Sequence, residues 1–290
     1  MKISLITTLT SLDENKRIEE EIRALGHDFE LVDLSEFKFS IIDNKLNVDK
    51  LDNLNCDIAI VRGIFTSIKS ISNVIVALKE RGIKIFDNNV LKHQYSIDKI
   101  GDILRLNINH LPIPDSFYSR DFEDYKKASQ TLGFPFVFKS SRMGKGASVY
   151  KLNNQNELND LISKLQEEGK EAKSFIAQKF IDYEYDIRAL VIGGEIFPMR
   201  RIPGQGEFRA NFSLGGSVET IELDSESRKL ANLAVKAVDM SVAGVDILID
   251  KQNKKYLLEV NHTAGFIGME KAYSKNIGKV YVEHAIANAK

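Results

Sequence analysis

In the first third of the chain, segments with the hydrophobic pattern of a strand alternate with segments that have the pattern of a helix. Four short apolar runs predict buried strands, at residues 2–7, 29–32, 57–61 and 83–86. Helical segments separate these runs. In the first of these segments, Ser11 and Glu14 have the spacing of a capping box, and the expected helix ends near Gly26. Because strands that alternate with helices form parallel sheets, residues 1–90 are expected to be a small open α/β domain.

From residue 91 onward the pattern is that of an α+β region with antiparallel hairpins. Helices are expected at 89–106, 121–132 and 155–168, and strands at 136–139, 149–152, 174–178 and 217–222. Two hairpins are expected, one joining 187–192 to 195–201 through a Gly-Gly pair and one joining 245–249 to 255–260. A further helix is capped by Asp224. We therefore predict one region over 91–290, with a central lobe at about 110–180 and a C-terminal lobe at about 181–290.

Composition and charge narrow the classes of function. The chain is 43% hydrophobic, and its 40 Lys and Arg residues balance 41 Asp and Glu residues, so a dedicated nucleic-acid binder is not expected. Its one cysteine, Cys56, cannot form an internal disulfide. The N-terminus turns polar too soon for a signal peptide, and no apolar run is long enough to span a membrane. A cytoplasmic protein without a membrane partner is the expectation.

Three oxygen-bearing side chains stand out in the second hairpin. Glu259 and Asn261 are two residues apart on one strand, so they share a face, and Asp246 on the paired strand can face them. Two carboxylates and an amide are hard ligands suited to Mg²⁺. All three project from otherwise apolar strands, which favours a metal site over an ordinary polar strand face. His262 follows directly and is expected to be structural or to support the site.

Two cationic segments could hold anions. Lys139 ends a strand and begins a Gly/Lys loop that runs to Gly146; taken alone, this loop is more simply read as an ordinary surface hairpin. Arginines also cluster on a Gly-rich stretch, at positions 200, 201 and 209, with Asn211 close behind. That stretch suits a mobile anion site and a solvated loop equally well.

Taken together, these motifs resemble those of the ATP-grasp superfamily. The chain is most similar to the RimK-type ligases, which attach glutamate or another amino acid to a carboxylate. The resemblance covers nearly the whole chain and rests on Asp186-Ile-Arg-Ala-Leu-Val, Arg200-Arg201, Gly206-Glu-Phe-Arg209-Ala-Asn211, Gly215-Gly216, Ala243-Gly-Val-Asp246-Ile-Leu and Glu259-Val-Asn261. It implies an ATP-grasp fold behind an N-terminal α/β (pre-ATP-grasp) domain.

The resemblance also implies roles for individual residues. It places the ATP phosphates at Lys99, Lys139 and the loop glycines Gly144 and Gly146, the adenine at the backbone of Gln178, Lys179 and Phe180, and the nucleoside near Asp186. It implies Asp246, Glu259 and Asn261 as the magnesium ligands. Arg209 and Asn211 are expected near the γ-phosphate and the reacting acyl group, which makes them, with Lys139, the expected catalytic residues. The expected substrate-binding residues are Arg62, Arg188, Arg200 and Arg201.

The expected activity is ATP-dependent carboxylate–amine ligation through an acyl phosphate, with Mg²⁺, for which Mn²⁺ could substitute. The acceptor would be a small-molecule carboxylate or a protein C-terminus, glutamate is the first choice of amino acid, and a homo-oligomer is left open. Two departures bear on the substrate. The loop after Lys139 is shorter than usual and is similar to that of D-alanine–D-alanine ligases. The family's small-Pro-Gly run is here His262-Thr263-Ala264-Gly265.

Three alternatives to this activity remain. The run that begins at Asn261 is similar to that of ligases acting on an amino-group carrier protein in lysine and arginine biosynthesis. A second alternative is D-alanine–D-alanine or glutathione-type ligation, which would keep the chemistry and change the acceptor. The third is a non-catalytic ATP-binding protein on the same fold.

Overall fold

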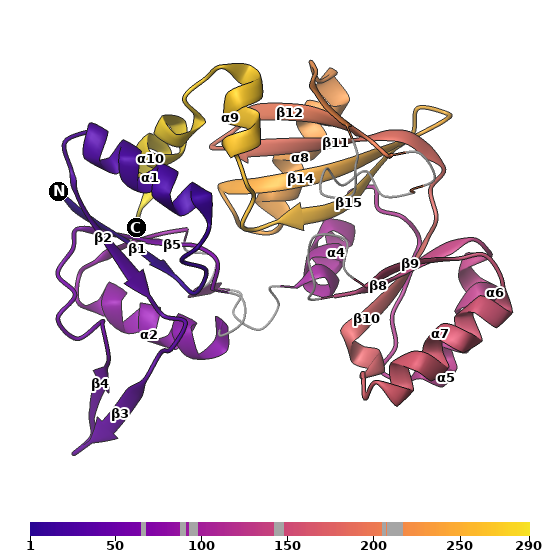
Figure 1. Ribbon diagram of the computed structural model, residues 1–290, viewed down its shortest axis with the longest axis horizontal. Coiled ribbons are helices and arrows are strands. Elements are labelled where there is room, and N and C mark those ends of the chain that lie inside the picture. Colours follow the sequence, from indigo (N-terminus) through magenta and orange to yellow (C-terminus); the bar gives the residue numbers. More distant parts are fainter. Residues whose placement is uncertain (65–67, 88–90, 93–97, 142–147, 205–206, 208–216) are drawn as a thin grey trace.

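The computed structural model describes residues 1–64, 68–87, 91–92, 98–141, 148–204, 207 and 217–290. Within these residues the chain forms three main sheets and one separate hairpin (Figure 1). The predicted combination of α/β and α+β architecture is confirmed. None of the described helices is long and apolar enough to cross a membrane.

The N-terminal sheet is parallel and has the strand order β2-β1-β5-β6. Its strands are β1 (Lys2–Thr7), β2 (Asp28–Asp33), β5 (Ile58–Val61) and β6 (Lys84–Phe86). Successive residues of β1 point to opposite faces, so Leu5 packs with α1 (Asp13–Ala24) and Ile6 packs with α2 (Ile68–Glu80). The two helices accordingly lie on opposite sides of the sheet in Figure 1.

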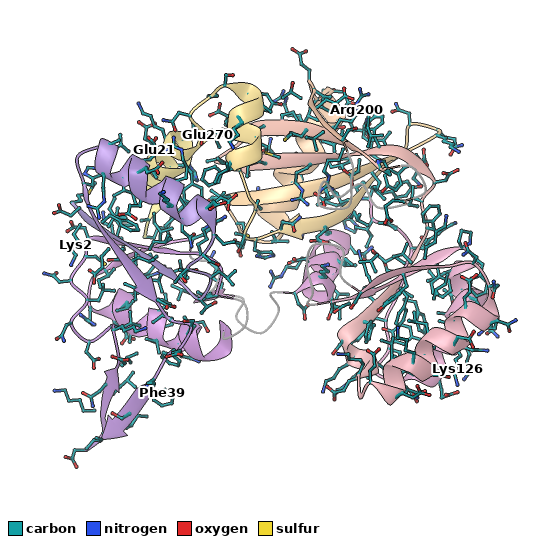
Figure 2. The ribbon with its side chains drawn as sticks, in the orientation of Figure 1. Lys2, Glu21, Phe39, Lys126, Arg200 and Glu270 are labelled. Carbon is teal, nitrogen blue, oxygen red and sulfur yellow. The ribbon has the colours of Figure 1, made fainter. Side chains whose placement is uncertain are left out.

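One hairpin in this part of the chain was not expected. Strands β3 (Phe39–Ile42) and β4 (Lys45–Val48) pair with each other alone and project away from the sheet (Figure 1). Asp43 and Asn44 form their turn with φ angles of 49° and 58°, as a two-residue hairpin turn requires. The side chain of Phe39, labelled in Figure 2, is exposed there.

The central sheet is built around an aromatic core and has the strand order β7-β10-β8-β9. Its strands are β7 (Ser116–Phe117), β8 (Phe136–Ser140), β9 (Val149–Leu152) and β10 (Phe175–Lys179). Helices α5 (Phe122–Lys126), α6 (Ala128–Leu132) and α7 (Gln155–Glu167) accompany it, with a short 3-10 turn at Ala172–Ser174. The single helix expected over 121–132 is therefore two short helices. Tyr125, Phe138 and Phe175 pack in the core between the helices and the sheet.

The third sheet is antiparallel, with the strand order β13-β12-β11-β14-β15. Its strands are β11 (Tyr183–Ile192), β12 (Glu195–Ile202), β13 (Ser217–Thr220), β14 (Val242–Asp250) and β15 (Lys255–Asn261). Both expected hairpins are confirmed. Helix α8 (Ser225–Ala237), capped by Asp224 as expected, packs on the face that carries Ile187 and Ala189. Helix α4 (Lys99–Ile108) lies beside the edge strand β15 (Figure 1), and its Leu106 packs in the same core as α8.

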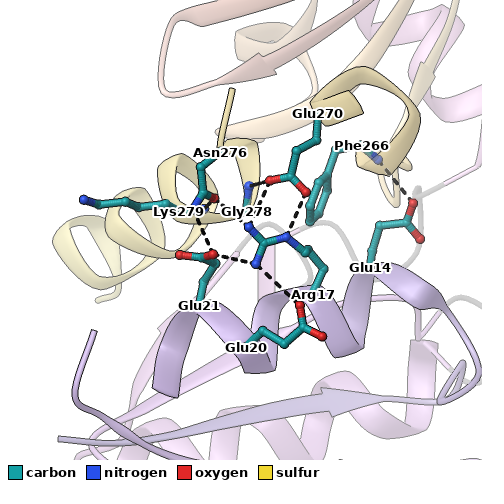
Figure 3. Close-up of polar contacts among 9 residues, drawn as sticks. All are labelled: Glu14, Arg17, Glu20, Glu21, Phe266, Glu270, Asn276, Gly278 and Lys279. Carbon is teal, nitrogen blue, oxygen red and sulfur yellow. Dashed lines mark hydrogen bonds and ion pairs between the residues drawn. The ribbon is translucent and has the colours of Figure 1, made fainter. Parts of the chain in front are cut away.

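The C-terminal helices return to the N-terminal sheet. Helices α9 (Ile267–Tyr273) and α10 (Ile277–Asn288) share one hydrophobic core with β1 and α1, and Ile85 and Lys290 exchange backbone hydrogen bonds. The expected cap of α1 was wrong: Leu12 is its N-cap residue and makes no side-chain cap bond. Instead, the Glu14 carboxylate accepts a hydrogen bond from the backbone of Phe266 (3.2 Å), which joins the two ends of the chain (Figure 3).

Candidate active site

One face of the five-stranded sheet carries a band of charged and polar side chains across four strands. Cross-strand partners in an antiparallel sheet project from the same face. The register pairs Asp186 with Arg201, Arg188 with Asp246, Asp246 with Glu259, and Gly244 with Asn261. We call this surface the site face; its members are Asp186, Arg188, Arg201, Asp246, Glu259 and Asn261.

A β-bulge brings Glu259 onto this face. Leu257 pairs with Ile247 and is buried towards α8, and Glu259 lies two residues further along the strand. In a regular strand the two side chains would share a face. The irregularity between Asp246 and Ile247 places one extra residue on β15, so Glu259 turns to the site face and lies opposite Asp246. The predicted shared face of the three expected metal ligands is confirmed by the regular register from the Gly244/Asn261 pair to the Asp246/Glu259 pair, and the bulge explains why Leu257 lies on the other face.

Two arginines hold the carboxylate of Asp246. Arg188 binds both of its oxygens, with Nη2 to Oδ2 at 2.8 Å, and Arg201 Nη2 lies 3.0 Å from Oδ2. Burial acts to raise the pKa of Asp246, but the two guanidinium groups outweigh it and lower this pKa. Arg201 also forms a bidentate pair with Asp186 at 2.6 and 2.7 Å. For Asp186 burial is the larger effect, and it raises the pKa to about 6.

Glu259 and Asn261 continue the band towards α4. Lys99 Nζ lies 3.2 Å from Glu259 Oε2. In the amide orientation that satisfies its neighbours, the Asn261 nitrogen donates to Glu259 Oε1 (2.7 Å) and its oxygen accepts from Arg188 (3.2 Å). Oxygen donors on two adjacent strands therefore lie in contact with one another or with shared cations, a donor set suited to Mg²⁺. The described residues hold no group of three or more His, Cys, Asp or Glu side chains able to bind a metal ion.

Lys139 brings a second lysine to this band from the central sheet. Its side chain is 4% exposed, and burial lowers its pKa to about 8. Glu259 and Asp246 act to raise the pKa of Lys139 and Lys99 acts to lower it, so the lysine lies within the electrostatic reach of these three groups. The backbone of Lys99 also contacts that of Ser141, just beyond β8 (3.4 Å). The structure thus gathers Lys99, Lys139 and the three expected metal ligands in one place.

The expected adenine segment lies at the end of β10. The amides of Lys179 and Phe180 already donate to the carbonyls of Asp115 (2.8 Å) and Pro135 (3.3 Å). Gln178 is buried and donates to Ser116 Oγ (2.9 Å), while its Oε1 atom is buried without a hydrogen-bond partner among the described residues. A buried acceptor left open is costly to the fold, so this oxygen is available to a ligand donor.

Other expected residues lie apart from the site face or outside the described residues. Arg200 precedes Arg201 and projects from the opposite face of β12, where it binds Glu219 (2.7 Å). Strand alternation alone indicates that two adjacent arginines cannot both face the site. Arg62 is buried at the end of β5 and donates to the Ala264 carbonyl (2.8 Å). The positions outside the described residues are Gly144, Gly146, Arg209 and Asn211.

Sequence analysis missed one residue of this region, Asp102. Its Oδ2 atom lies 2.8 Å from Nε2 of His262, and both side chains are buried. The available signal was its position on α4, three residues after Lys99, because residues three apart share one side of a helix. The support expected from His262 therefore has a structural basis.

Comparison with known proteins places this geometry in a family. Residues 96–284 match the RimK-like ATP-grasp domain. The chain is 28% identical over 295 residues to the probable alpha-L-glutamate ligase 2 of Pseudoalteromonas atlantica (strain T6c / ATCC BAA-1087), covering 100% of this chain and 97% of that protein. It is 26% identical over 239 residues to human N-acetylaspartylglutamate synthase A, covering 80% of this chain and 60% of that protein.

A solved structure shows the same fold. The ATP-grasp ligase PsnB, complexed with a phosphomimetic variant of a minimal precursor, Mg and ADP, has a TM-score of 0.74 and 20% sequence identity. The match covers 99% of this chain and 98% of that chain. Because the family match spans well over half of the chain, the expected identity as an ATP-grasp ligase is confirmed at the level of the family. The protein belongs to the family of the RimK-like ATP-grasp domain.

Proposed function

We propose that this protein is an ATP-dependent carboxylate–amine ligase that uses Mg²⁺ and forms an amide through an acyl phosphate. The observation that carries this proposal is the convergence of Lys99 and Lys139 on the site face, next to Asp246 and Glu259. Cations from a helix and from another sheet, beside hard oxygen donors, suit a metal-bound polyphosphate. Membership of the RimK-like family supports the same activity.

The residues present fit magnesium and ATP. Asp246, Glu259 and Asn261 would hold the metal, which neutralises phosphate charge when bound. Lys99 and Lys139 would bind phosphate oxygens as fixed cations. The open Oε1 atom of Gln178 is an acceptor suited to the amino group of adenine, whereas the amides of the next two residues are already engaged.

The proposed reaction has two steps. A substrate carboxylate attacks the γ-phosphorus of ATP, the bond to the β–γ bridging oxygen breaks, and ADP leaves. An amine then attacks the acyl carbon, phosphate leaves with the bonding electron pair, and the amine loses a proton. Positioned cations stabilise the oxygens that gain charge, and no covalent protein nucleophile is required. The resemblance assigns part of this work to Arg209 and Asn211.

Glutamate is the amino acid we propose, joined to a small-molecule or peptide carboxylate. The two relatives described above are named as a glutamate ligase and as a synthase of N-acetylaspartylglutamate. Among the four expected substrate-binding arginines, Arg188 is the one that is partly exposed on the site face beside the metal set, so we propose that it binds an acidic substrate. Arg200 projects from the other face of the sheet, where it binds Glu219, so we do not assign it the same substrate contact.

An ADP-release screen tests this function. Purified protein with Mg²⁺ and ATP is combined with candidate acceptors and all common amino acids, and products are identified by mass spectrometry. ADP release that requires both a carboxylate and an amine, with glutamate in the product, is the expected result, and Glu259→Gln serves as the inactive control. A neutral amino acid in the product would favour the D-alanine–D-alanine type. Turnover that requires an amino-group carrier protein would identify a ligase of lysine or arginine biosynthesis, and turnover that requires a glutathione-type acceptor would identify a glutathione-type ligase. Nucleotide binding without turnover on any pair would indicate a non-catalytic protein.

A further inference from the structure

The chain segment that follows the expected metal ligands has no regular secondary structure of its own. It runs from the end of β15 at Asn261 to the start of α9 at Ile267. Three side chains from distant elements hold it: Asp102 contacts His262, Arg62 binds the Ala264 carbonyl, and Glu14 accepts from the Phe266 amide. Tertiary contacts therefore set the conformation of this segment.

Asp102 makes the contact closest to the site face. Asp98 caps α4 by accepting from Gly101 (2.8 Å), which places Lys99 and Asp102 in the first turns of the helix. Lys99 lies 3.2 Å from Glu259, and Asp102 Oδ2 lies 2.8 Å from His262. Helix α4 is thus attached twice to the end of β15, once on either side of Asn261.

We propose that Asp102 is a positioning residue that acts through His262 to fix Asn261 and Glu259 in the arrangement that binds magnesium. This inference rests on the proposed function, because it assigns the metal to those two residues. Groups that orient metal ligands contribute strongly to metal affinity even though they do not touch the ion. His262 follows Asn261 directly in the chain, so a contact that fixes His262 restrains the backbone from which the Asn261 side chain projects.

The contacts of Asp102 favour this role over a contribution to stability alone. The side chain is 4% exposed, and its Oδ1 atom has no hydrogen-bond partner among the described residues. A buried carboxylate with an unsatisfied oxygen is costly to the fold, and an apolar residue of similar size would pack there at a lower cost. Such an apolar residue could not accept a hydrogen bond from His262 and so could not orient its ring.

The test compares single and double variants in binding experiments that do not need turnover. Mg²⁺-dependent ADP binding is measured by calorimetry, and Mn²⁺ binding to the ADP complex is measured by electron paramagnetic resonance. We expect Asp102→Ala and His262→Ala each to weaken metal-dependent ADP binding about tenfold. The double variant should be no weaker than either single variant, because both act through one contact. ADP binding without metal should change less than about twofold by the same argument.

Two further variants separate positioning from stability. Asp102→Asn keeps an oxygen that can accept from His262, so it should retain affinity within about threefold of the wild type. Leu106→Ala removes a fully buried side chain from the same helix, and it should lower the melting temperature while leaving metal-dependent affinity unchanged. If Asp102→Ala does not fold, the loss must appear in His262→Ala and be absent from Asp102→Asn.

The outcomes distinguish this inference from the proposed function. A wild-type protein that binds no Mg·ADP contradicts the proposed function itself. If the wild type binds Mg·ADP and both Asp102→Ala and His262→Ala bind it equally well, only the positioning role is overturned. An equal loss of affinity in Leu106→Ala, or additive losses in the double variant, also overturns it, because the effect would then be one of general stability.

Discussion

Two arginine–carboxylate clusters lie at different places in this protein. The first is the site face. The second joins α1 to the C-terminal helices, and we call it the joint cluster; its members are Arg17, Glu20, Glu21, Glu270 and Asn276 (Figure 3). Both contain bidentate pairs between a guanidinium group and a carboxylate. Sequence composition alone therefore does not distinguish them.

The two clusters differ in which parts of the protein supply the partners of their charged groups. In the joint cluster, the carboxylate of Glu270 is satisfied by Arg17 and by the backbone amide of Gly278 (3.0 Å), and Asn276 caps α10. These groups bind one another between α1, α9 and α10, and Figure 3 shows Glu21 and Glu270 on either side of Arg17. On the site face, Glu259 forms an ion pair with Lys99, and its negative charge also acts to raise the pKa of Lys139 on another sheet. Convergence of donors from separate lobes, more than the number of ion pairs, marks the candidate active site.

The largest effect should follow Glu259→Gln. This change keeps the shape of the side chain but removes a charge from the expected metal set, so turnover should fall by about two orders of magnitude or more. The fold should survive, as circular dichroism would check. Near-normal turnover at saturating Mg²⁺ would remove Glu259 from the metal site.

Asp186→Ala should cause the largest loss of stability. Arg201 would keep only Asp246 as a buried partner, and breaking a buried pair costs about 3 kcal/mol of unfolding free energy. Urea denaturation measures this change. A loss below about 1 kcal/mol, the value typical of an exposed pair, would show that the site face tolerates charge imbalance as the protein surface does.

The pH dependence of ADP affinity should report Lys139. Burial lowers its pKa to about 8, so the ammonium group loses its proton as pH rises through that value. A neutral amine binds phosphate less well, so affinity should be full below pH 8 and should fall above it. Bound phosphates favour the charged form and move the midpoint upward. Calorimetry over a pH series checks this, and Lys139→Arg, which stays charged, should show a flat profile if Lys139 is the source.

The smallest effect should follow Arg17→Met in the joint cluster. Its ion pairs are partly exposed, so the unfolding free energy should fall by only about 1 kcal/mol. Turnover in the ADP-release assay should stay at the wild-type level, because the cluster does not reach the site face. A variant that folds normally but loses activity would show that the joint also controls the active site.

Local pattern determined much of this protein from the sequence alone. Period-2 and period-3.6 runs indicated the parallel N-terminal sheet and both hairpins of the five-stranded sheet, because side-chain direction repeats within a few residues. The shared face of Glu259 and Asn261 followed from the same alternation. The same alternation places Arg200 and Arg201 on opposite faces of their strand.

Tertiary structure alone decided the rest. The extra residue on β15 depends on which strand lies opposite, and the approach of Lys139 depends on how the central sheet meets the five-stranded sheet. Glu14 has the spacing of a helix cap but bonds to Phe266, 252 positions away, and Asp102 meets His262 across 160 positions. Such contacts carry no local signal, because they form only when separately folded elements pack together and buried polar groups must find partners.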